Sequence, residues 1–410
     1  PASYAEQYGL TSRIQWSDGN HLGVNVANRR LNIIRTDLLT TPPENTLVGR
    51  IDQALRILKG GVVTSTFYEV GSGLEARRSF FYSEVAPGQG THIWVDYNGN
   101  SIKELNEFEI APFEYEANFI RVSVQNTEYI KTYSNTLNES IQLNFARIFN
   151  PNKRWGQWLG KVNNVSVWRQ ERKTSATDLQ ARMDPIFDWR ADTALLTVSG
   201  LVRNVFFFNR SSPIFGMDHT YQRTSRREIL LGGFDQQEEL LQSVQVRYTF
   251  FGQLTLFATG SQTLKQQGSD ILLGRNYSLR IDKLEPRLLW QKDAEKSIEL
   301  HSKYAQVREL SGASSGLIRE IGTLMTLNVM DKSSFSASID YATIQYNGSA
   351  NSPVGFEVLS GLSIGENIIW NMTWLQSVAK NLQLNITYQG RDSEVGKTVH
   401  VGSVQVRAVF

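Results

Sequence analysis

Long segments of this chain alternate apolar and polar residues with period two, and this pattern constrains the fold more than any other feature. The stretch VQVRYTF at 244–250 places Val, Val, Tyr and Phe on one face and Gln, Arg and Thr on the other. The stretches LQLNITY at 382–388 and VQVRAVF at 404–410 do the same. Because successive side chains of a strand point to opposite faces, the alternation predicts an all-β fold.

Three further features favour a membrane barrel over a soluble β-sandwich. The alternating segments run for roughly 10 to 15 residues, enough to cross a bilayer at a tilt. Their polar faces carry Gln, Asn, Arg, Ser and Asp, as a water-filled lumen permits. Short turns such as QSVAK and MDKS alternate with longer loops such as YNGSANSPVG and ELSGASSG. We therefore predict a transmembrane antiparallel β-barrel of about 18 strands, either complete or part of a larger barrel.

Composition excludes several other classes of protein. The 42 basic and 40 acidic residues leave a net charge of +2, without the basic surface that a nucleic-acid partner requires. The chain has no cysteine, which excludes disulfides, thiolate metal sites and a cysteine nucleophile.

Counting connections back from the C-terminus divides the chain into three parts. Residues 1–85 and 137–410 are expected to form barrel strands, and 86–136 a large loop region. The final strand ends in Phe410, and in this respect the chain resembles bacterial outer-membrane β-barrels. That resemblance implies that Phe410 lies at the periplasmic end, and the parity of the strands then places 86–136 outside the cell.

The loop region contains a run of acidic and amide residues with the spacing of a twelve-residue calcium loop. Numbered from the first aspartate, positions 1, 3, 5, 7, 9 and 12 are Asp96, Asn98, Asn100, Ile102, Glu104 and Glu107. In such loops the side-chain oxygens, with a backbone carbonyl at position 7, surround the ion. Ser101 stands where the sharp turn favours glycine. The alternative to calcium is an Asn-Gly turn with solvated acids.

The same segment carries a family resemblance. The run GQGTHIWVDYNGNSIKELNEFE resembles a segment of large, uncharacterised outer-membrane proteins of the Bacteroidota, in which it precedes a C-terminal barrel. The resemblance covers residues 72–123. It implies an outer-membrane location and a barrel architecture, without a nameable activity. Such proteins are much longer, which implies that this chain is a C-terminal portion, and they favour glycine at the position of Ser101.

No catalytic arrangement stands out. The five histidines are scattered, and His219 beside Asp218 and His92 beside the acidic run are the only candidates for a surface hydrolase site. We expect no enzymatic activity.

Aromatic residues have two interpretations. Trp370, Met372, Trp374, Tyr388 and the FFF of 206–208 are expected to face lipid or to form interfacial girdles. Trp94, Trp155 and Trp158 could alternatively stack on sugars.

The sequence thus predicts a non-enzymatic outer-membrane β-barrel that acts as a scaffold or conduit in an export, assembly or uptake complex. The expected partners are outer-membrane lipid and proteins such as lipoproteins or secretion and uptake subunits, with no nucleic acid. A self-sufficient porin-like channel and, less favoured, a surface hydrolase remain as alternatives.

Overall fold

The protein is an all-β chain organised around one large sheet. The computed structural model describes residues 2–35, 44–150, 152–184, 194–230, 233–270, 272–329, 332–379 and 381–408. Within them the sheet has 19 strands, of which β5 and β6 have only three residues each, leaving seventeen long ones.

The long strands follow one another along the chain. They are β1 (Ser3–Ser17), β2 (Asn20–Ile33), β3 (Glu44–Ile57), β4 (Val62–Glu84), β7 (Phe119–Asn144), β8 (Val162–Thr174), β9 (Leu195–Phe208), β10 (Phe215–Leu230), β11 (Gly233–Phe250), β12 (Leu254–Ser269), β13 (Tyr277–Gln291), β14 (Lys296–Glu309), β15 (Ser315–Val329), β16 (Ser333–Tyr346), β17 (Gly365–Ala379), β18 (Leu382–Ser393) and β19 (Val399–Ala408).

The other elements are short and lie in the connections. The short strands are β5 (His92–Trp94) and β6 (Phe108–Ile110); the helices are α1 (Phe145–Ile148), α2 (Arg154–Leu159), α3 (Leu179–Met183) and α4 (Pro353–Leu359), with 3₁₀ turns η1 (Leu58–Gly60), η2 (Leu105–Glu107), η3 (Glu114–Glu116) and η5 (Leu273–Arg275). None of the helices in the described residues is long and apolar enough to cross a membrane.

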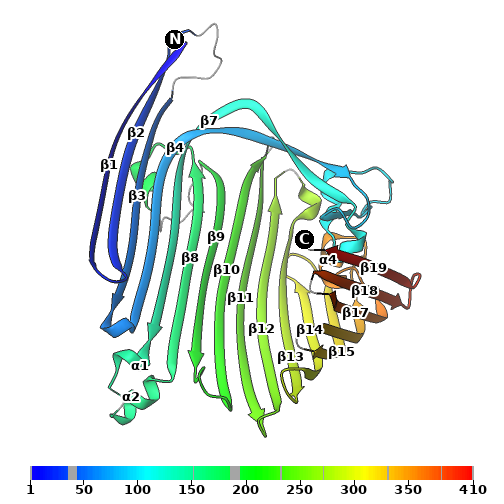
Figure 1. Ribbon diagram of the computed structural model, residues 1–410. Helices are drawn as coiled ribbons and strands as arrows, with labels where there is room; N and C mark the ends of the chain where they lie inside the picture. Colours follow the sequence, from blue (N-terminus) through cyan, green and yellow to red (C-terminus); the bar gives the residue numbers. More distant parts are fainter. Residues whose placement is uncertain are drawn as a thin grey trace.

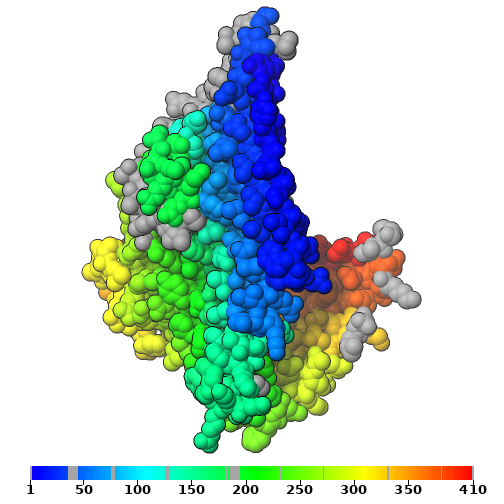
Figure 2. All heavy atoms as spheres, turned by 90° about the vertical axis from the view of Figure 1, so that its left-hand side faces the viewer, coloured from blue at the N-terminus to red at the C-terminus, as the bar shows by residue number. Residues whose placement is uncertain are grey.

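The long strands pair antiparallel with their neighbours in sequence, from β1–β2 to β18–β19, with β4 paired to β7. Figure 1 shows the resulting curved sheet. Among the described residues no pairing joins β1 to β19, so both strands have a free edge; Figure 2 looks onto the side where β1 forms a long blue ridge. The predicted antiparallel all-β fold is confirmed, with seventeen long strands against about 18 expected, in an open sheet.

The two faces of the sheet differ in chemistry. On one face the strands expose large apolar side chains: in β14, Ile298, Leu300 and Tyr304 are 40%, 54% and 47% exposed. We call this the outer face, and the opposite face, on which α4 packs, the inner face. In β14 the inner face carries His301 and Lys303. The alternation read from the sequence therefore separates an exposed apolar face from a polar one.

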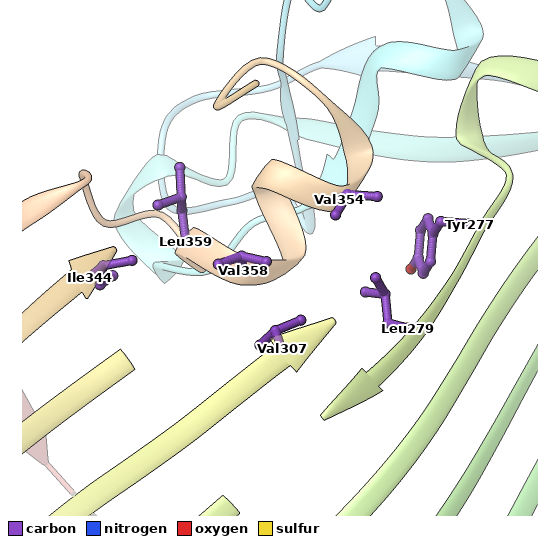
Figure 3. Close-up of a cluster of buried hydrophobic side chains, with 7 residues drawn as sticks. All are labelled: Tyr277, Leu279, Val307, Ile344, Val354, Val358 and Leu359. Atoms are coloured by element: carbon purple, nitrogen blue, oxygen red, sulfur yellow. The ribbon is translucent and has the colours of Figure 1, made fainter. Parts of the chain in front are cut away.

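Helix α4 covers part of the inner face. Ser352 caps it by accepting a hydrogen bond from the Gly355 amide (2.9 Å), with Pro353 in the first turn. Its apolar side chains pack with residues of β13, β14 and β16, and this buried cluster comprises Tyr277, Leu279, Val307, Ile344, Val354, Val358 and Leu359. Figure 3 shows the helix lying across the ends of these strands. The helix thereby covers the inner face at the end of the sheet where β13 begins and β14 and β16 end.

The predicted loop region 86–136 is shorter in the structure, because β7 already begins at Phe119. Strands β4 and β7 have 23 and 26 residues and stay paired from Val62 to Glu84. A tilted strand needs only about 9–11 residues to cross a bilayer, so this hairpin extends well beyond the rest of the sheet. In Figure 1 it arches toward the C-terminal strands and α4.

Candidate functional site

The tip of the β4–β7 hairpin forms a small folded unit, residues 85–118, which we call the cap. Strands β5 and β6 pair within it, with His92 opposite Ile110 and Trp94 opposite Phe108. Phe108 and Phe119 are each 4% exposed. The Phe108 ring stacks on Tyr82 of β4 at 4.1 Å between centroids, and Phe119 meets it edge-on at 5.0 Å. This aromatic core fixes the cap to the end of the hairpin.

The predicted calcium run folds into consecutive tight turns at the surface of the cap. The Asp96 carboxylate accepts hydrogen bonds from the amides of Gly99 (2.7 Å) and Ser101 (2.9 Å). Asn98 Oδ1 accepts from the Asn100 amide (3.0 Å), and Asn100 Oδ1 from the Ile102 amide (2.6 Å). Ser101 has φ +59°, the left-handed conformation that glycine adopts most readily. The side chains at positions 1, 3 and 5 thus shape the turn through the backbone amides.

The last residue of the run, Glu107, lies inside the cap. Its side chain is fully buried, although the motif expects it to close the loop around an ion. Oε2 accepts hydrogen bonds from Trp94 Nε1 (2.9 Å) and the Glu104 amide (3.4 Å), and Oε1 from the Tyr97 amide (3.2 Å). Asn98 Nδ2 donates to Glu104 Oε2 (2.8 Å). Glu107 therefore ties the run to β5, and calcium binding stays a prediction.

A buried ion pair anchors the cap to the loop between β12 and β13. Arg275 Nη2 donates to Glu109 Oε2 at 2.8 Å, and the two side chains are only 20% and 11% exposed. Tyr97 Oη donates to Glu109 Oε1, also at 2.8 Å. Burial raises the pKa of Glu109, against the opposing effects of Arg275 and Tyr97. The pair therefore stabilises docking only while both partners are present.

A second anchor joins the cap to β18. Arg391 forms an ion pair with Glu116 and donates to the Gly361 carbonyl at 2.8 Å, while its guanidinium lies 4.6 Å from the centre of the Phe113 ring. Burial raises the pKa of Glu116, and Arg391 partly offsets this. Gly361 packs so closely on Pro112 that a Cβ there would come within 3.0 Å of it. The cap is thus held to the sheet at two separate places.

A cavity of about 540 Å³ lies between the cap and the inner face. Its charged lining comes from the cap, from β7, β10, β11 and β12, from η5 and from α4, and includes Glu109, Arg121, Arg226, Glu228, Asp235, Lys265, Arg275 and Glu357. Lys265 Nζ and Tyr277 Oη both donate to Glu357 Oε1, at 2.6 and 2.9 Å. Four acidic and four basic groups thus line this space.

The structure separates the residues considered for catalysis. Asp218 and His219 are consecutive in β10, so their side chains point to opposite faces. His92 Nδ1 lies 2.8 Å from Thr91 Oγ1. Burial lowers its pKa, helped by the nearby cations Arg121 and Arg275. The pairing of His219 with Asp218 considered from the sequence is therefore not formed.

The three loop tryptophans do not form one sugar-binding platform. Trp94 lies in the cap, whereas Trp155 and Trp158 lie in α2, at the end of the sheet that carries the short turns (Figure 1). Trp155 and Trp158 are 51% and 59% exposed.

Sequence reasoning did not identify the docking arginines. Arg275 and Arg391 are about 166 and 275 residues from their acidic partners along the chain, and no local motif marks either. Such a contact between distant segments of the chain forms because the long β4–β7 hairpin arches over to these residues. It therefore depends on the unusual length of the hairpin.

Comparison with known proteins yields only distant structural matches. No family model and no curated protein matches the chain. Solved structures that match include the ferric-catecholate import receptor Fiu of E. coli K12, in its closed form (TM-score 0.40, 10% identity, 97% of this chain and 65% of that one) and its open form (TM-score 0.37, 10% identity, 95% and 64%). Outer-membrane expressed OmpT of Vibrio cholerae also matches (TM-score 0.30, 8% identity, 84% and 95%). The chain spans about 64% of the length of Fiu. Similarity this low leaves the function to be argued from the residues.

Proposed function

We propose that the protein is a non-enzymatic bacterial outer-membrane β-barrel protein that acts as a scaffold or conduit, with one mouth covered by the cap. The observation that supports this best is the outer face. Exposed apolar side chains recur there from strand to strand, for example Leu10 in β1, Val244 in β11, Ile321 in β15 and Val404 in β19, which are 72%, 39%, 62% and 68% exposed. In water such a surface is unfavourable, whereas lipid accommodates it.

The distribution of aromatic residues on the outer face supports the same placement. Phe250, Trp290 and Trp374 lie near the short turns, and Tyr304 and Tyr341 lie further along their strands. Outer-membrane barrels carry aromatic girdles at both interfaces of the apolar band. The β4–β7 hairpin would then extend past the bilayer, with the cap on the extracellular side.

The covered mouth favours a role in a complex over a freely open pore. Two ion-paired anchors hold the cap, one against the loop between β12 and β13 and one against β18. A conduit closed in this way requires a partner, or a change in conditions, to release it. Lipoproteins or secretion and uptake subunits would be the partners. A porin-like channel remains the second candidate, because charged groups line the cavity beneath the cap.

Membrane insertion can be tested by electrophoresis. Closed barrels resist unfolding in SDS, so protein folded in detergent and left unheated should migrate differently from a boiled sample. A soluble sheet would show the same mobility in both lanes. Because the free edges of β1 and β19 need pairing in lipid, cross-linking in the same samples should report whether closure occurs within one chain or between chains.

Calcium binding by the cap is part of the proposal. Asp96, Asn98, Asn100, Ile102, Glu104 and Glu107 have the required spacing, and the first three already order the turn. With three carboxylates, affinity in the range of about 0.1–1 mM is expected, which suits an extracellular site.

Substituting Glu107 by glutamine separates the structural role of this residue from calcium binding. The amide would place an N–H against a backbone or indole N–H, leaving a buried donor unpaired, at a cost of about 1–3 kcal/mol. Hydrogen exchange of residues 92–110 should therefore speed up even in chelator. If Glu107 also binds calcium, the difference from wild type should grow when millimolar calcium is added. Glu114→Gln, at an exposed position of the cap outside the calcium run, serves as the control for folding of the cap.

A further inference from the structure

A histidine and two carboxylates meet on the inner face, on three neighbouring strands. His301 comes from β14, Glu320 from β15 and Asp340 from β16, and one ligand atom of each lies within 4.8 Å of the other two. His301 Nε2 is 2.6 Å from Asp340 Oδ1. The group lies below α4 on the same face as the Val307 side chain. None of these residues belongs to the cap or its anchors.

The strand register explains how the group forms. Gly322 of β15 pairs with His301 on one side and with Asp340 on the other. A Cβ at Gly322 would lie 1.9 Å from Asp340 Oδ1 and 2.5 Å from His301 Nε2. The missing side chain leaves the space in which these two atoms meet, and Glu320, two residues earlier in the same strand, faces the same space.

The surroundings of His301 suit a metal ligand. An ionised carboxylate only accepts hydrogen bonds, so the contact with Asp340 puts the imidazole proton on Nε2. Nδ1 is buried and has no hydrogen-bond partner among the described residues; the nearest carboxylate oxygen, Glu299 Oε1, is 3.8 Å away. With a metal on Nε2, the proton would move to Nδ1 and face Glu299. Histidine ligands usually donate their second N–H to such a carboxylate.

We propose that His301, Glu320 and Asp340 bind a divalent transition-metal cation of the zinc class. One imidazole nitrogen and two carboxylate oxygens form a donor set that zinc accepts at about 2.0–2.2 Å, with a fourth position left for water. Glu320 now pairs with Lys303, with Nζ 3.2 Å from Oε2, and Arg287 lies 3.7 Å from Glu299. Lys303 is the internal cation that the metal displaces. Its side chain is 30% exposed and can turn toward the lumen.

The test measures Zn²⁺ binding to the folded full chain in detergent by equilibrium dialysis, with Co²⁺ absorption as a report on geometry. Asp340→Asn and His301→Gln should each weaken binding at least roughly tenfold. Lys303→Gln should strengthen it, because the competing cation is gone. Gly322→Ala should abolish it by filling the space between the ligands.

A matched control exists in the same chain. His21 Nε2 lies 3.2 Å from Asp52 Oδ2, and a Cβ at Gly23 would come within 2.4 Å of that carboxylate, but the residues described there supply no second carboxylate to complete a group of three. His21→Gln should leave zinc binding unchanged. Equal binding by wild type, Asp340→Asn and His301→Gln would overturn the proposal, and so would weaker binding by Lys303→Gln. Hydrogen exchange of β14–β16 in metal-free buffer identifies any variant that has simply misfolded.

Discussion

Alanine at Arg275 should release the cap from the loop between β12 and β13, with the Arg391 anchor still in place. The substitution leaves Glu109 with its carboxylate 11% exposed and without its cation, and removing one partner of a buried ion pair costs about 3–5 kcal/mol. Exposure of the Arg275 side chain (20%) puts the expected loss near the lower end of this range. Hydrogen exchange in residues 85–118 should rise while β11 and β12 keep their protection. In planar bilayers the variant should conduct more than wild type.

The same variant should depend on pH in a defined direction. Burial already raises the pKa of Glu109, and losing Arg275 removes the main opposing effect. A raised pKa in the docked state means that docking is favoured below that pKa and lost as pH rises through it. Acidification should therefore restore the docked cap in Arg275→Ala. Arg226→Ala breaks a more exposed pair with Glu228 and is the control. If it releases the cap equally, Glu109–Arg275 is not the anchor.

Those parts of the fold could be predicted from the sequence whose pattern lies within a few consecutive residues. The alternation at 244–250 and 382–388 lies within single strands, β11 and β18 of the structure. It is visible in the sequence because the two faces of each strand meet different environments, one polar and one apolar. The short turn at Phe251–Gly252, where both residues adopt positive φ, is likewise formed by residues adjacent in the chain. Such features follow from side-chain chemistry along a few residues.

Contacts between distant strands could not be foreseen. His301 and Asp340 meet only because both pair with Gly322, and a shift of one residue in either pairing would turn one of the side chains to the opposite face. The scattered histidines therefore gave no signal. The length of β7 was also missed: residues 119–136 were assigned to a loop, because extension beyond a bilayer leaves no distinct pattern in the alternation.

The outer-face assignment is tested most severely by placing a charge on it. Val246 in β11 pairs with the apolar residues Met217 and Ala258. Leu384 in β18 pairs with Val406 on one side and with Gln376 on the other. Arginine at either position should destabilise protein folded in lipid vesicles by about 2–4 kcal/mol if it lies at the bilayer midplane. Denaturant titration of vesicle-inserted protein measures this change.

The matched control is the residue that precedes Val246 in the same strand, Gln245. Gln245 lies on the opposite face of β11, where its side chain donates a hydrogen bond to Thr259 Oγ1 at 3.1 Å. Gln245→Arg should cost far less, because a long cation there extends into the polar interior. Equal losses at 245 and 246 would mean that neither face meets lipid, and a larger loss at 245 would reverse the faces. In detergent-free buffer the order should not persist, since a charge on an exposed apolar face improves its contact with water. A face-specific penalty that appears only in lipid would therefore establish the bilayer, and not a partner protein, as the environment of the outer face.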